Sequence, residues 1–155
     1  MKPLRQNPDT LPASISCLVL PLTDRKLLVP NTAVAEVLLS SEEPQRIDHA
    51  LCYGWITWRD QRLPLISLEV VLGSHRPVLG DSYRIAVFNT IGPRAEKGFF
   101  AVRLGAIPQS IQVTQSGVFE EATASRLLMA AVVDNERLWV PNLELVEAEI
   151  AALPS

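Results

Sequence analysis

The segment from Tyr53 to Gly73, YGWITWRDQRLPLISLEVVLG, constrains the fold more than any other part of the chain. From Trp55 to Arg59, side chains alternate between two faces with the period of two that is typical of a β-strand. The polar pair Asp60-Gln61 predicts a tight turn, and the apolar run LPLI after it predicts the returning strand. Ser67 is placed to cap a short helix with Glu69 in its first turn, where the helix dipole favours an acid. The segment therefore predicts a β-hairpin that leads into a capped helix.

A similar unit of hairpin and helix recurs towards both ends of the chain. The sequence LLVPN at 27–31 returns as LWVPN at 138–142, each time after a turn of acidic and basic residues. RLPLISLEV at 62–70 also aligns with RLWVPNLEL at 137–145. We expect a helix from Asn31 to about Leu39 and a terminal helix from Asn142, each capped by its asparagine. Short apolar hairpins often resemble one another by chance, so the alternative that the repeat has no structural meaning stays open.

The remaining apolar runs predict further strands and a mostly β fold with a few short helices. They cover residues 15–22, 83–91, 98–104, 106–113, 127–133 and 137–140. Small barrels are the usual way for many short strands to hide their edges.

Composition excludes several classes of protein. The length of 155 residues suits one domain or two small lobes, and 48% apolar residues supply a core. A net charge of −3 argues against nucleic-acid binding, which depends on clustered Lys and Arg. The apolar runs fall well short of the ~20 residues that cross a bilayer, so we expect no membrane insertion. The N-terminal segment lacks the apolar stretch of a secretion signal, and two cysteines make no disulfide framework. We therefore expect a cytoplasmic protein, with tails at 1–14 and 151–155.

The sequence offers little for catalysis. His49 and Cys52 have a spacing that metal ligands use, but a zinc site needs at least three ligands and the sequence supplies no others nearby. There is no Gly-x-Ser-x-Gly motif and no glycine-rich phosphate loop. We predict a protein that is not an enzyme and that uses no metal or cofactor. An enzyme, the alternative, would require a pocket with perturbed titratable groups.

Tryptophan and arginine gather around the predicted turn. Trp55 and Trp58 have opposite parity, so one should pack in the core and the other should be exposed beside Arg59 and Arg62. Tryptophan and arginine are enriched at the energetic centres of protein interfaces. Arg59, Arg62 and Trp58 are therefore candidate protein-interaction residues. The alternative is that both tryptophans pack inside and both arginines are merely solvated.

Residues 54–68, GWITWRDQRLPLISL, resemble the signature of CheW-like domains. In that signature a glycine and an apolar strand lead to an Arg-Gly turn, an apolar-Pro-apolar strand and an Asp-Leu step into a short helix. Residues 15–39, 84–88, 99–104 and 127–146 resemble the other elements of the family in the same order. Asp60 stands where the family usually has Gly, and Ser67 where it usually has Asp. Both changes are mild, because Asp tolerates left-handed backbone and Ser still caps a helix. They suggest a divergent, ChpC-like member from a type IV pilus chemosensory system.

The resemblance implies two small SH3-like β-barrels packed around a shared core over residues 15–150. It also implies a non-enzymatic adaptor that couples methyl-accepting chemoreceptors to a CheA-type histidine kinase, in the pilus case for twitching motility. Arg59 matches the motif arginine of the receptor- and kinase-facing region. Gly54 matches a structural glycine, and we expect Gly54 and Asp60 to shape the turn. The alternative function is a stand-alone β-barrel that binds proteins in another bacterial assembly.

Overall fold

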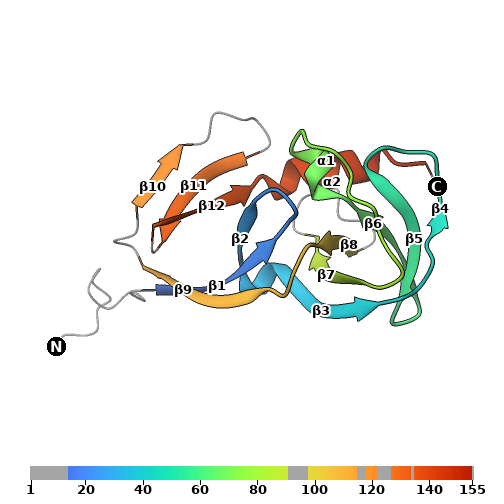
Figure 1. Ribbon diagram of the computed structural model, residues 1–155, viewed down its shortest axis with the longest axis horizontal. Coiled ribbons are helices and arrows are strands. Elements are labelled where there is room, and N and C mark those ends of the chain that lie inside the picture. The colour runs from blue at the N-terminus through green and yellow to red at the C-terminus, as the bar shows by residue number, and fades with distance from the viewer. Residues whose placement is uncertain (1–13, 91–97, 115–117, 122–126, 134, 155) are drawn as a thin grey trace.

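The computed structural model describes residues 14–90, 98–114, 118–121, 127–133 and 135–154. These residues form two six-stranded sheets and a few short helices (Figure 1). The first sheet contains β1 (Ser14–Pro21), β2 (Lys26–Pro30), β9 (Gln109–Thr114), β10 (Val118–Glu121), β11 (Leu127–Val133) and β12 (Glu136–Pro141). The second sheet contains β3 (Val34–Ser40), β4 (Gln45–Arg46), β5 (Cys52–Trp58), β6 (Gln61–Ile66), β7 (Tyr83–Asn89) and β8 (Phe99–Leu104). The helices are the 3-10 turn η2 (Asn31–Ala33), α1 (Leu68–Val71) and α2 (Leu143–Ala151).

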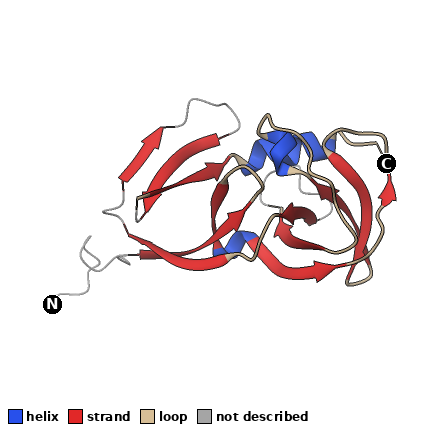
Figure 2. Cartoon of the chain, in the orientation of Figure 1, coloured by secondary structure: helices blue, strands red, loops and turns tan. Residues whose placement is uncertain are grey.

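Each sheet curls into a small barrel, and the two barrels lie side by side (Figure 1). The strand order is β10-β11-β12-β2-β1-β9 in the first and β3-β7-β8-β6-β5-β4 in the second. Neighbouring strands are antiparallel except for β12 with β2 and β6 with β8. Both α-helices lie over the junction of the barrels (Figure 2), where Val71 of α1 and Val146 of α2 join one apolar cluster. The predicted mostly β fold is confirmed.

The protein has three apolar cores, and they explain why several strands have apolar residues at consecutive positions in the sequence. Val19 and Leu28 pack in a cluster inside the first barrel, whereas their neighbours Leu20 and Leu27 belong to a core shared by both barrels. The same alternation occurs along β7 and β8, whose other face lines the interior of the second barrel. A strand that is buried on both faces needs apolar residues at every position. The shared core includes Leu20, Leu27, Val29, Phe88, Phe100, Val102 and Val146.

The predicted caps are right in two of the three repeated units. The Ser67 hydroxyl accepts a hydrogen bond from the Val70 amide, and Asn142 accepts one from Leu145. The predicted helix from Asn31 to Leu39 is wrong, because only the 3-10 turn η2 forms there and Asn31 does not cap it. Residues 34–40 instead pair with β7 as strand β3. The first and third units nevertheless meet, since β2 and β12 run parallel as neighbours.

The C-terminal end of the chain packs more closely than the sequence suggests. Of the expected N-terminal tail at 1–14, residues 1–13 lie outside the described part of the chain, and Ser14 already belongs to strand β1. Helix α2 continues to Ala151, and Leu153 still packs against the shared core. Across the described part of the chain, no helix is both long enough and apolar enough to cross a membrane.

Candidate protein-interaction site

Arg59 and Asp60 form the two-residue turn between β5 and β6. Their φ angles are +48° and +63°, so both residues adopt the left-handed backbone that such a hairpin turn requires. Trp58 and Gln61 pair directly across it. The predicted turn therefore lies one residue too late, and Asp60 occupies it as expected. This geometry holds Arg59 at the tip of the hairpin.

A single carboxylate fixes the side chain of Arg59. Its Nη2 donates to Glu36 Oε1 at 3.2 Å, and the Nε1 of Trp58 donates to the same oxygen at 2.9 Å. The guanidinium lies 4.7 Å from the ring centroid of Trp58, a cation–π contact. The Arg59 side chain is nevertheless 67% exposed. The turn thus presents a positive charge in one orientation, supported by groups from β3 and β5.

Trp58 supports this arrangement from inside the barrel. It is 7% exposed and belongs to the apolar cluster of the second barrel. Its ring packs on Phe99 with the centroids 4.9 Å apart. Little of Trp58 is therefore accessible at the surface, and its contacts with Glu36 and with the guanidinium help to orient Arg59.

Trp55 faces the opposite side of β5, as its parity predicts, but it is also buried. Only 8% of it is exposed, because β4 lies alongside and Arg62 covers the ring at 4.4 Å from the centroid. Arg62 is held there by a 3.1 Å hydrogen bond to Gln45 Oε1. The prediction that one of the two tryptophans is exposed is therefore wrong. Each tryptophan lies under an arginine that is itself exposed.

Gly54 lies inside β5 and not in the turn, which corrects the expectation for this residue. Its φ is +144°, and the pairing of β5 with β6 shifts register between Cys52 and Gly54. A Cβ at this position would lie 2.3 Å from the carbonyl oxygen of Gln45. Glycine is required because the backbone of β4 approaches so closely.

An acidic hollow of about 280 Å³ lies beside the hairpin. Glu42, Glu43, Trp55 and Arg62 are among its lining residues. Both carboxylate oxygens of Glu42 accept from the Thr57 amide at 3.1 Å. Strand β4 pairs only with Gly54 and Trp55 of β5, so the amide of Thr57 lies beyond it. Glu42 satisfies this amide, which could otherwise pair with a strand of another molecule.

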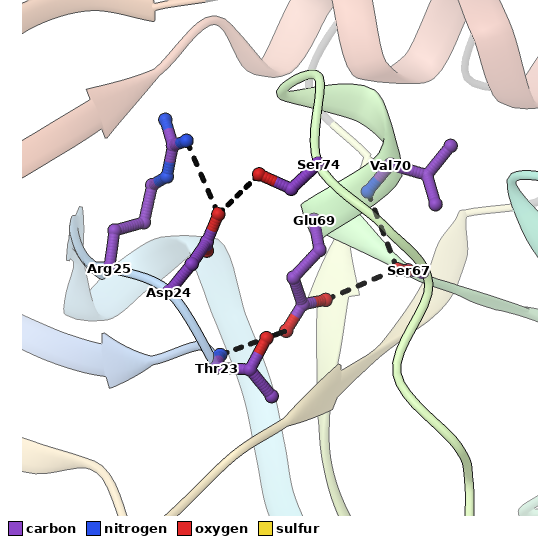
Figure 3. A network of polar contacts seen from close by, with 7 residues as sticks. All are labelled: Thr23, Asp24, Arg25, Ser67, Glu69, Val70 and Ser74. Carbon is purple, nitrogen blue, oxygen red and sulfur yellow. Dashed lines mark hydrogen bonds and ion pairs between the residues drawn. The ribbon is translucent and has the colours of Figure 1, made fainter.

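Glu69 has a role that the sequence does not reveal. It stands in the first turn of α1 as predicted, but it is fully buried. Its carboxylate accepts from the amide and hydroxyl of Thr23 and from the hydroxyl of Ser67 (Figure 3). Close by, Ser74 donates to Asp24, which also pairs with Arg25. Hydrogen bonds from Ser74 and Arg25 hold the pKa of Asp24 below its usual value, although burial opposes them. A buried carboxylate needs such donors, and only the fold brings these residues together.

His49 and Cys52, which have the spacing of metal ligands, each have a structural hydrogen-bond partner. His49 Nδ1 accepts from the Leu51 amide at 3.1 Å, and the Cys52 thiol donates to the Gly54 carbonyl. Burial raises the pKa of Cys17 and of Cys52 above the usual value, which favours the protonated thiol in both. Among the described residues, no group of three or more His, Cys, Asp or Glu side chains could hold a metal ion.

Comparisons with known proteins agree with this architecture. No curated protein matches the chain in a sequence search. The fold is similar to the crystal structure of the scaffolding protein TtCheW from Thermoanaerobacter tengcongensis, with a TM-score of 0.69 and 17% identity. That match covers 84% of this chain and 90% of TtCheW, and it confirms the two-barrel fold. The CheW-like domain matches residues 16–146. The chain therefore belongs to the CheW-like domain family.

Proposed function

We propose that this protein is a non-enzymatic, cytoplasmic adaptor that couples methyl-accepting chemoreceptors to a CheA-type histidine kinase. Membership of the CheW-like family supports the class of role. The observation that carries the proposal is the exposed Arg59, which Glu36 and Trp58 hold in one orientation at the hairpin tip. An adaptor needs such preorganised contacts, because ordering long side chains at an interface otherwise weakens binding.

Arg59 is the residue that we assign to partner contact, with Arg62 beside it and Trp58 beneath it. Arg62 covers Trp55 and offers a second exposed cation on the same hairpin. Gly54 and Asp60 act on the backbone: Gly54 admits β4, and Asp60 completes the turn. The divergent turn and cap residues support assignment to a type IV pilus chemosensory system. In that setting, deletion of the gene should impair twitching and leave swimming unchanged.

Binding of the purified protein to the kinase and receptor fragments encoded nearest to its gene tests the proposal. We expect Arg59→Glu to weaken binding to at least one partner by about tenfold or more, since it reverses an interfacial charge. Arg46→Glu is the matched control, because Arg46 is an exposed arginine that pairs with Glu43 outside the turn. Circular dichroism must show that both variants fold.

Two results would contradict the proposal in different ways. If the wild-type protein binds neither partner, the adaptor role is rejected and a binding module of another assembly is favoured. Normal binding of both partners by Arg59→Glu would reject only the role of Arg59.

A further inference from the structure

The segment that leads from α1 to β7 crosses one end of the second barrel. At this end β5 and β7 begin and β6 and β8 finish, as their registers require. We call residues 74–79 the strap, and none of them belongs to a helix or strand. Gly73 and Gly80 on either side have φ angles of +96° and +80°. Within the described part of the chain, the strap has a single backbone–backbone hydrogen bond, from the Ser74 amide to the Glu69 carbonyl.

Side-chain contacts hold the strap against the barrel. The Nη1 of Arg76 donates to the carbonyls of His49 and Cys52 at 3.0 and 3.1 Å. Its guanidinium also lies 4.8 Å from the ring centroid of Tyr53, a cation–π contact. The Tyr53 hydroxyl donates to the carbonyl of Pro77 at 2.6 Å. Arg76 is itself exposed, so water can take over its hydrogen bonds when the strap moves away.

The strap buries little apolar surface. Leu79 is 7% exposed and packs in the interior cluster of the second barrel, whereas Val78 beside it is 87% exposed. Leu79 is the one large apolar side chain that the strap buries. Segments with few buried apolar contacts and few backbone hydrogen bonds open at a smaller cost than the fold as a whole.

A buried charge at the same end of the barrel opposes closure of the strap. Arg103 lies on β8 two residues after Ala101 and opposite Ile85, so its side chain shares their face, which lines the barrel interior. Its Nε and Nη1 atoms are buried without a hydrogen-bond partner among the described residues. Its charge acts on Tyr53, where it opposes the rise in pKa that burial causes. Unsatisfied donors of a buried charge cost free energy, and water that enters beside Tyr53 would offset that cost.

We propose that the strap opens as a local unit while the second barrel stays folded, and that two arginines set the balance. Arg76 holds the strap closed, and Arg103 favours the open state, in which water reaches its donors. The hairpin tip with Arg59 lies at the opposite end of β5. The inference therefore does not depend on the proposed adaptor function.

Thiol labelling of Leu79→Cys measures the opening, with Leu63→Cys as the matched control. Both positions belong to the interior cluster, but Leu63 lies on β6 and outside the strap. The native Cys17 and Cys52 are buried, and the wild type gives their background rate. Below the unfolding transition, urea should barely change the labelling rate of Leu79→Cys, because local opening exposes little surface. Leu63→Cys should be labelled through unfolding, at a rate that rises steeply with urea.

Substitutions made in the Leu79→Cys protein test the two arginines, so that the loss of the leucine itself cancels in each comparison. Arg76→Gln should speed labelling by about tenfold or more, since it removes contacts of the closed state alone. Arg103→Met keeps the length of the side chain without its charged donors and should slow labelling by about fivefold or more. Arg62→Gln is the control, because the contact of Arg62 to Trp55 persists when the strap opens. It should leave the rate unchanged.

Chymotrypsin, which cleaves after leucine, repeats the comparison without a cysteine at Leu79. Cleavage after Leu79 at low urea should be faster in Arg76→Gln than in the wild type and slower in Arg103→Met. The absence of such cleavage in all three proteins would overturn the inference. So would labelling of Leu79→Cys that depends on urea as steeply as that of Leu63→Cys, because the strap would then leave only when the barrel unfolds. A rate that Arg76→Gln does not raise, or that Arg103→Met does not lower, would overturn the role of that arginine.

Discussion

The buried carboxylate of Glu69 accepts two hydrogen bonds from Thr23, a residue 46 positions earlier in the chain. The donors are the backbone amide at 3.0 Å and the hydroxyl at 3.1 Å. Thr23 lies in the turn of the β1–β2 hairpin in the first barrel, whereas Glu69 lies in α1, directly after β6 of the second. The contact therefore joins the two barrels by polar bonds beside the apolar core that they share.

Removal of this carboxylate should destabilise the whole protein. Glu69→Ala leaves the amide and hydroxyl of Thr23 and the hydroxyl of Ser67 without their acceptor. We expect a loss of about 3 kcal/mol in the free energy of unfolding, measured with urea, because buried donors are left unsatisfied. Glu144→Ala is the control, since Glu144 is also a first-turn acid but is exposed. Equal losses in the two variants would show that the contact to Thr23 contributes nothing beyond helix capping.

Gly54 should tolerate no side chain. Gly54→Ala places a Cβ 2.3 Å from the Gln45 carbonyl oxygen, so β4 must move away from β5. We expect a loss of at least about 3 kcal/mol in unfolding free energy, or failure to fold. Gly73→Ala separates this clash from backbone strain, because Gly73 has φ +96° with nothing within 4 Å of the added Cβ. It should cost only about 1–2 kcal/mol. Similar losses would mean that the close approach of β4 is not what requires glycine at 54.

Sequence patterns predicted most strands, because a strand that is buried on both faces has apolar residues at consecutive positions. The alternation of Leu27 and Leu28 between two cores requires apolar residues at both positions. The helix predicted over residues 34–39 was wrong for two reasons. Asn31 resembles a helix cap, and a short apolar run is compatible with either a helix or a strand. Pairing with β7 decides in favour of the strand. That pairing joins residues between 43 positions apart (Ser40 and Tyr83) and 54 positions apart (Val34 and Phe88), which local patterns do not encode.

Sequence patterns predicted only part of the candidate site, because several of its contacts join residues that are far apart in the chain. Arg59 follows from a turn motif that is contiguous in sequence, whereas its partner Glu36 comes from β3. The burial of Trp55 depends on β4, a two-residue strand in a segment that reads as irregular. Glu69 looks like an ordinary first-turn acid, because its contact to Thr23 exists only after the two barrels meet. Residues that act through distant contacts leave no periodic signal.

Alkaline pH should destabilise the protein partly through Tyr53. Burial raises the pKa of this phenol to about 12 from its usual value near 10, against the opposing influence of Arg103. Its hydroxyl donates to the Pro77 carbonyl at 2.6 Å, which also requires the protonated form.

The direction of the effect follows from proton binding. Between pH 10 and 12 the folded protein keeps the Tyr53 proton that the unfolded chain has lost, so unfolding releases a proton and stability falls as pH rises. Below pH 10 both states are protonated, and the contribution is fully present.

Urea unfolding of the wild type and of Tyr53→Phe from pH 8 to pH 12 measures this contribution. Tyr53→Phe loses the bond to Pro77 at every pH, but it should lose less further stability above pH 10 than the wild type does. Tyr83, Cys17 and Cys52 also have raised pKa values, and because they remain in both proteins their effects cancel in the difference. Parallel curves for the two proteins across this range would show that Tyr53 ionises equally in the folded and unfolded states.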